Sequence, residues 1–78
     1  MKELVEYLAR SLVDRPDEVS VESFEEDDGT VVYELTVADD DVGKVIGRNG
    51  RTVNALRTVV RASAVRHGRR VLVDVLDD

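Results

Sequence analysis

The sequence predicts an α+β fold in which three helices pack on one face of a three-stranded mixed sheet. Two long stretches repeat apolar residues every three or four positions, as amphipathic helices do. Three shorter stretches alternate apolar and polar residues, as half-buried strands do. With a short helix before a glycine-rich turn, the element order is α-β-β-α-α-β. A chain of 78 residues can bury one small core, so we expect a single domain over residues 1–78.

The first predicted element is an amphipathic helix over residues 2–14. Its apolar positions follow one another at helical spacing; they are Leu4, Val5, Leu8, Leu12 and Val13. Pro16 disfavours helical geometry at Arg15, so we expect the chain to leave the helix there and to become extended.

Two strands are predicted next, over roughly 18–25 and 30–38, and they should pair as an antiparallel hairpin. The Asp28-Gly29 pair between them suits a turn that needs a positive φ. The second strand alternates apolar and polar residues, which gives it one buried face and one solvent face. Phe24 breaks the alternation of the first strand, so it predicts either a bulge or an exposed aromatic side chain.

The second half of the chain is expected to form a short helix over 42–46, a longer helix over 51–66 and a last strand over 71–76. The carboxylates of residues 39–41 should cap the short helix or point into solvent. The long helix should end at Gly68. The last strand should lie beside the second strand, after a right-handed crossover. The buried face of the long helix is predicted to consist of Val53, Leu56, Val60 and Ala64.

Charge is divided unevenly along the chain. Residues 1–41 carry 3 Lys/Arg and 14 Asp/Glu, a net −11, whereas residues 42–78 carry 8 and 3, a net +5. The overall charge of −6 would disfavour a nucleic-acid partner, but the basic half offers a surface for a polyanion. An acidic protein with an incidental basic helix is the alternative.

Composition excludes several classes of site. The sequence has no Cys and a single histidine, His67, so we predict neither a disulfide nor a metal site. No serine has a base and an orienting group in a recognisable pattern, so we predict no catalysis. No run of about 20 apolar residues could span a bilayer, and the N-terminus lacks a signal-peptide core. A cytoplasmic protein without membrane insertion is expected.

The residues that carry chemistry gather at the turn Gly47-Arg48-Asn49-Gly50, which joins the two later helices. Glycine reaches backbone angles closed to other residues and lets a ligand approach the main chain. The start of the next helix offers free N–H groups and a partial positive charge. Lys44, Arg48 and Arg51 add full charges. The turn therefore predicts a phosphate cradle.

Other glycine-rich phosphate motifs do not fit this segment. A P-loop needs Lys and Ser or Thr after its last glycine, whereas Arg48 and Asn49 follow Gly47. The Rossmann fingerprint needs its glycines directly after a strand, and here three aspartates come just before them. We therefore predict no nucleotide cofactor and no small-molecule substrate.

The segment Val45-Ile46-Gly47-Arg48-Asn49-Gly50 resembles the hydrophobic-Ile-Gly-x-x-Gly signature of KH domains, whose loop clamps nucleic-acid backbone. With the element order above, the chain is similar to type II KH domains, and over nearly its whole length to the small bacterial KH proteins of the KhpA family. This resemblance implies binding of single-stranded RNA with low sequence specificity, as an RNA chaperone or post-transcriptional regulator. It also implies a homodimer, or a heterodimer with a larger KH-containing protein.

The predicted site has two parts. The RNA-binding residues are expected to be Lys44, Ile46, Gly47, Arg48, Asn49, Gly50, Arg51 and Val53. Bases would lie in an apolar groove formed by Val37, Val42, Val45, Ile46 and Val53, of which Ile46 and Val53 have a plain core role as an alternative. Arg57 and Arg61 extend the basic track or only solvate the helix.

A second, small-residue stripe on the long helix consists of Ala55, Val59 and Ala62. Small apolar residues are common helix filler, but they would also permit close helix-helix approach in a dimer. A KH-shaped protein adaptor with minor RNA contact is therefore the alternative function.

Overall fold

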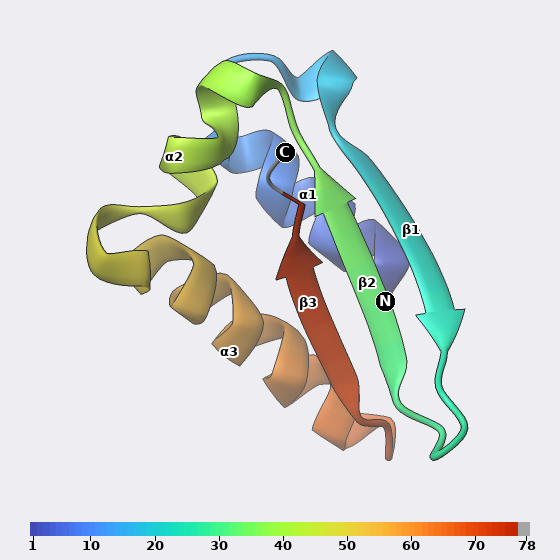
Figure 1. Cartoon of the computed structure of the whole chain (residues 1–78). Helices are drawn as coiled ribbons and strands as arrows, with labels where there is room; N and C mark the ends of the chain where they lie inside the picture. Colours follow the sequence, from blue (N-terminus) through green and yellow to red (C-terminus); the bar gives the residue numbers. More distant parts are fainter. Residues whose placement is uncertain (77–78) are drawn as a thin grey trace.

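The structure is a computed structural model that describes residues 1–76. The three strands described below form one sheet, and Figure 1 shows the helices behind one face of it. Its elements are α1 (Lys2–Leu12), β1 (Ser20–Glu25), β2 (Val31–Thr36), α2 (Val42–Ile46), α3 (Arg51–Arg66) and β3 (Val71–Val75). Single-turn 3-10 helices lie at Pro16–Glu18, Asp39–Asp41 and Arg48–Gly50. The predicted α+β fold and its α-β-β-α-α-β order are confirmed.

The central strand β2 pairs antiparallel with β1 and parallel with β3. This confirms both the hairpin and the placement of the last strand beside the second. Gly29 closes the hairpin turn with a φ of 89°, and the Asp28 side chain accepts a hydrogen bond from the Thr30 N–H at 2.9 Å. The strand pairing continues through Phe24 without a bulge. That side chain is 48% exposed, so the exposed aromatic is the correct alternative.

The hydrophobic core lies between the helices and the inner face of the sheet. The buried face of α3 is the predicted one, Val53, Leu56, Val60 and Ala64. The buried face of α1 differs from the predicted one. Ala9, which is not among the predicted apolar positions, is fully buried, whereas Leu12, which is among them, is 37% exposed. Val5 and Ala9 contact the same cluster as Leu35 of β2 and Val60 of α3, so one core joins both ends of the chain.

Helix α1 ends at Leu12, two residues before the predicted boundary, and the reason is a tertiary contact. Val13 is already extended, and the backbone N–H groups of Asp14 and Arg15 donate to the carboxylate of Asp41 at 3.2 and 3.1 Å. Asp41 is 1% exposed and makes no side-chain capping hydrogen bond to α2. The expectation that it caps that helix or points into solvent is therefore wrong.

Candidate functional site

The turn between α2 and α3, residues 47–50, rests on backbone angles that most residues avoid. Gly47 has φ 76° and ψ 173°, and Gly50 has φ 76° and ψ 12°. Asn49 lies between them at φ 56° and ψ 27°, in the left-handed region that asparagine tolerates better than most residues. The Gly50 N–H donates to the Gly47 carbonyl at 3.2 Å. This tight turn leaves the Arg48 and Asn49 side chains exposed.

The two glycines of the turn meet different constraints. A Cβ on Gly47 would lie 2.7 Å from the Thr52 Cβ and 2.9 Å from the Thr52 nitrogen, so the first turn of α3 leaves no room for it. A Cβ on Gly50 would approach nothing closer than the Asn54 amide nitrogen at 3.8 Å. Gly47 is therefore required by both angle and space, whereas Gly50 is required by angle alone.

Positive charge at the turn comes from Arg48 and Arg51. Both side chains are exposed, and within residues 1–76 neither forms an ion pair with a carboxylate. In the same part of the chain no side chain caps the start of α3, so the positive end of the dipole of this helix also lies at the turn. An anion at this place would find two guanidinium groups and a helix N-terminus together.

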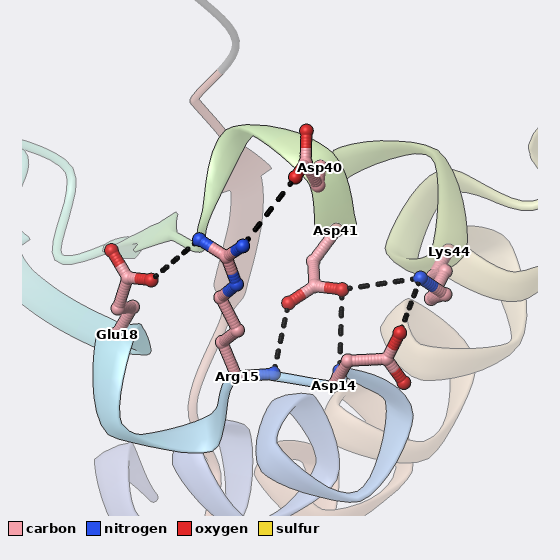
Figure 2. Close-up of polar contacts among 6 residues, drawn as sticks. All are labelled: Asp14, Arg15, Glu18, Asp40, Asp41 and Lys44. Carbon is pink, nitrogen blue, oxygen red and sulfur yellow. Dashed lines mark hydrogen bonds and ion pairs between the residues drawn. The ribbon is translucent and has the colours of Figure 1, made fainter.

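Lys44 is placed differently from these arginines. Its ammonium lies 2.8 Å from the Asp14 carboxylate and 3.4 Å from the Asp41 carboxylate, as Figure 2 shows. The hydrogen bond that Lys44 donates to the Asp14 carboxylate is the main cause that raises the pKa of Lys44, and the Asp41 carboxylate adds to it. Lys44 is thus paired with two carboxylates, and its contact with Asp14 joins α2 to the segment that follows α1.

Asp41 is the centre of this contact and fixes the helix that leads into the turn. Burial alone would raise the pKa of its carboxyl, but hydrogen bonds from the Asp14 and Arg15 N–H groups and from Lys44 outweigh burial and hold the pKa below its ordinary value. Around it, Arg15 pairs with Asp40 at 3.7 Å and with Glu18 at 3.5 Å. This polar cluster, drawn in Figure 2, positions α2 against α1.

The apolar residues predicted to contact bases divide by burial. Val37, Val45 and Val53 are buried, and the first two belong to the central core cluster. Val42 and Ile46 are half-buried, so they provide the accessible apolar surface beside the turn. The burial of Val53 fits a core role, whereas the half-buried Ile46 is placed both to pack in the core and to contact a base.

On α3 the remaining candidates are separated. The Nε–H of Arg57 donates to the Val73 carbonyl on β3 at 3.0 Å, so this arginine bridges helix and sheet, while Arg61 is exposed. Ala55, Val59 and Ala62 are all exposed, with Val59 at 49%, so the predicted stripe lies on the surface.

Within residues 1–76 no group of three His, Cys, Asp or Glu residues is placed to hold a metal ion. Nor does any helix in that range have the length and apolar character needed to cross a membrane. The Nδ1 atom of His67 lies 2.9 Å from the Ser63 carbonyl oxygen, at the C-terminal end of α3.

Known proteins resemble this chain in sequence and in fold. The family model for the KH domain of KhpA/KhpB matches residues 2–75. The RNA-binding protein KhpA of Halalkalibacterium halodurans is 54% identical over 78 residues, which cover 99% of this chain and 100% of the relative. The protein of the same name from Clostridium acetobutylicum is 47% identical over 76 residues, covering 97% of this chain and 100% of the relative.

Among solved structures, Aquifex aeolicus Era bound to GDP and AlF4− has a TM-score of 0.66 at 22% identity, over 99% of this chain and 31% of the Era chain. An Era complex with a segment of 16S ribosomal RNA has a TM-score of 0.67, also at 22% identity, and this chain spans 30% of it. These two likenesses bear on the fold alone. Since the family match covers nearly the whole chain, the protein belongs to the KhpA/KhpB KH-domain family.

Proposed function

We propose that this protein binds single-stranded RNA as a single KH domain spanning residues 1–78, without catalytic activity. The turn of residues 47–50 holds the RNA backbone. The observation that carries this is the charge of Arg48 and Arg51 beside the turn, for which residues 1–76 provide no paired carboxylate. The relatives that match over their full length are named RNA-binding proteins. An RNA chaperone or post-transcriptional regulator in the cytoplasm is the role we infer.

Low sequence specificity follows from where the aromatic side chains lie. Many modules that recognise specific single-stranded RNA stack the bases on aromatic rings and read the base edges by hydrogen bonds. Here Tyr7 is on α1, Phe24 is on β1, and Tyr33 is only 6% exposed. Backbone contacts from the turn, with apolar contact from Val42 and Ile46, therefore supply the affinity. Such contacts recognise phosphate and shape rather than base identity.

The turn can be tested by replacing Arg48 and Asn49 with aspartate together. We expect RNA binding to fall by roughly a hundredfold or more, because two groups that face phosphate become negative. Folding should persist, since both side chains are exposed and aspartate also tolerates the left-handed angles of residue 49. Fluorescence anisotropy with a labelled single-stranded RNA, at low and at physiological salt, measures the affinity, and circular dichroism checks the fold.

Lys2→Asp provides the control for general charge. It reverses the charge of one exposed lysine at the start of α1. The variant to compare with it is Arg48→Asp alone, which reverses the charge of one arginine in the turn. The RNA affinity of Lys2→Asp should stay within about twofold of the parent, because one distant surface charge is largely screened. Equal losses for Arg48→Asp and Lys2→Asp would mean that overall charge governs binding, and the turn would no longer be the site.

A second function is favoured by the exposed stripe on α3. We infer that Ala55, Val59 and Ala62 contact the same helix of a second KH domain, either another copy or a larger KH-containing protein. Small residues on a solvent-facing helix permit close helix-helix approach, and Val59 leaves 49% of its surface exposed. In the adaptor alternative, this contact is the main activity and RNA contact is minor.

Val59→Asp should convert a dimer into a monomer, because a carboxylate buried without a partner at an apolar contact opposes association. Light scattering after size-exclusion chromatography measures the molar mass. Asn54→Asp, at an exposed position of α3 about 100° around the helix from Ala55, introduces the same charge off the stripe and should leave the dimer intact. If Val59→Asp breaks the dimer and the parent protein shows no RNA binding at low salt, the adaptor function replaces the RNA-binding one.

A further inference from the structure

The sheet face opposite the helices, here called the open face, carries an ordered pattern of side chains. Figure 1 shows the helices on one side of the sheet only. Strand pairing aligns residues across all three strands into two neighbouring rows. The apolar row is Phe24, Val32 and Leu72, and the acidic row is Glu22, Glu34 and Asp74. Their side chains alternate with the core residues of the same strands, so they project from the open face.

The apolar row leaves a hydrophobic strip in contact with solvent. Phe24 is 48% exposed and Leu72 is 44% exposed, whereas Val32 between them is 3% exposed. Val32 is buried without belonging to the central core cluster, which fits a side chain flanked on the open face by its two larger neighbours. With strands about 4.8 Å apart, the apolar row is roughly 10 Å long across the sheet, a length that about two turns of helix span.

The acidic row places three like charges next to one another. Directly aligned residues on neighbouring strands have Cβ atoms about 5 Å apart, and like charges there are destabilising. Within residues 1–76, none of the three carboxylates forms an ion pair or a side-chain hydrogen bond. No Lys or Arg of the described residues pairs with this row. A basic side chain from another molecule would therefore relieve the repulsion among the three carboxylates.

The chemistry of the two rows restricts what can cover them. RNA is repelled by the acidic row, as is an anionic lipid surface. A second copy that used the same face would bring three more carboxylates to the contact and no basic residue from its own two rows. What complements both rows is a segment with apolar residues along one side and Lys or Arg beside them.

We propose that the open face binds a basic amphipathic helix of a partner protein. Its apolar side covers Phe24, Val32 and Leu72, and its basic side chains pair with Glu22, Glu34 and Asp74. Sheets in small domains are ordinarily covered by helices. The two rows run across the strands and lie two residues, about 7 Å, apart, so a helix that lies along the apolar row brings the side chains of its basic flank to the acidic row. This binding is separate from RNA binding at the turn.

A designed peptide tests the proposal on the full-length protein. The probe is a helical peptide of about four turns, with leucines along one side and lysines on both flanks. Two-dimensional NMR of the labelled protein should show shifts concentrated at the outward residues of β1, β2 and β3. A peptide in which glutamates replace the lysines should not bind. Shifts concentrated on the helices or on the hairpin turn would overturn the proposal.

Charge-matched variants separate the open face from general attraction to an acidic protein. Glu34→Gln with Asp74→Asn should weaken peptide binding by about three- to tenfold, since two ion pairs are lost. Asp17→Asn with Asp27→Asn removes the same charge at two exposed positions outside the rows and should change the affinity by less than about twofold. Equal weakening by both pairs would overturn the proposal.

Two more variants test whether a loss of peptide binding comes from unfolding and whether the peptide and RNA share one site. Phe24→Ser changes a half-exposed side chain, and it should weaken peptide binding while circular dichroism stays unchanged. Arg48→Asp with Asn49→Asp should bind the peptide as the parent does, even when RNA binding is lost. If that variant loses both ligands, peptide and RNA share one site and the open face is not the docking surface.

Discussion

Gly47→Ala should destabilise the protein by about 3–5 kcal/mol, because it combines a glycine-only backbone conformation with a steric clash. At φ 76° and ψ 173° an alanine is strained, and its Cβ would fall 2.7 Å from the Thr52 Cβ. The atoms it meets include the backbone nitrogen of Thr52, which cannot rotate away as a flexible side chain could. Chemical denaturation followed by circular dichroism gives the free energy of unfolding.

The other glycines near the turn provide graded controls. Gly43→Ala lies within α2, has no positive φ, and its Cβ would meet nothing within 4 Å. It should therefore stabilise the protein by about 0.5–1 kcal/mol through better helix propensity. Gly50→Ala meets only the left-handed angle and should cost about 1–2 kcal/mol. If Gly47→Ala cost no more than Gly50→Ala, the crowding by Thr52 would be absent.

The second large effect is expected at Asp41. Asp41→Ala should lower the melting temperature by roughly 10 °C, because the N–H groups of Asp14 and Arg15 lose their acceptor and Lys44 loses one of its two carboxylates. The start of α2 would then be held less firmly against α1. Differential scanning calorimetry measures the change.

Asp40→Ala is the neighbouring control. Asp40 is adjacent in sequence, but its side chain is 81% exposed and pairs with Arg15 only at 3.7 Å. Its loss should move the melting temperature by no more than about 2 °C, since exposed ion pairs contribute little. Comparable effects for Asp40→Ala and Asp41→Ala would show that the buried hydrogen bonds of Asp41 are not what stabilises this corner.

The same carboxylate makes stability depend on pH. The pKa of Asp41 lies below its ordinary value of 3.8, so the folded state favours the ionised form more than the unfolded state does. Its contribution is present in full above that ordinary value and is lost as pH falls through the lowered pKa. Asp41→Asn should therefore flatten the acid side of the stability profile relative to the parent protein, as measured by thermal unfolding over a pH series.

Much of this fold could be predicted because its signals are local. Helix α3 begins and ends at the predicted residues, since its start follows a glycine turn and Gly68, with φ 67°, lies just beyond its end. The turn itself was also predictable, because glycine spacing and neighbouring arginines are visible within a few residues.

The role of Asp41 could not be predicted for a physical reason. An aspartate just before a helix ordinarily signals a cap, and its true partners are backbone N–H groups 26 and 27 residues earlier. Every non-proline residue carries such a donor, so no sequence pattern marks these two. Lys44 shares the difficulty, because only the docking of α1 decides whether its ammonium meets a carboxylate or the turn.

The bond from Arg57 to β3 has a consequence for how copies of this protein meet. β3 is an edge strand, and edge strands expose backbone groups that can recruit a strand from another molecule into a growing sheet. The backbone N–H and C=O groups of residues 72, 74 and 76 face β2, whereas those of the residues between them face outward. The Val73 carbonyl therefore lies on the outer edge of the sheet, where it accepts a hydrogen bond from the Arg57 guanidinium. A strand from another molecule would have to displace the Arg57 side chain from the middle of β3 before it could pair with this edge. The Arg57 hydrogen bond therefore protects the protein from edge-to-edge aggregation.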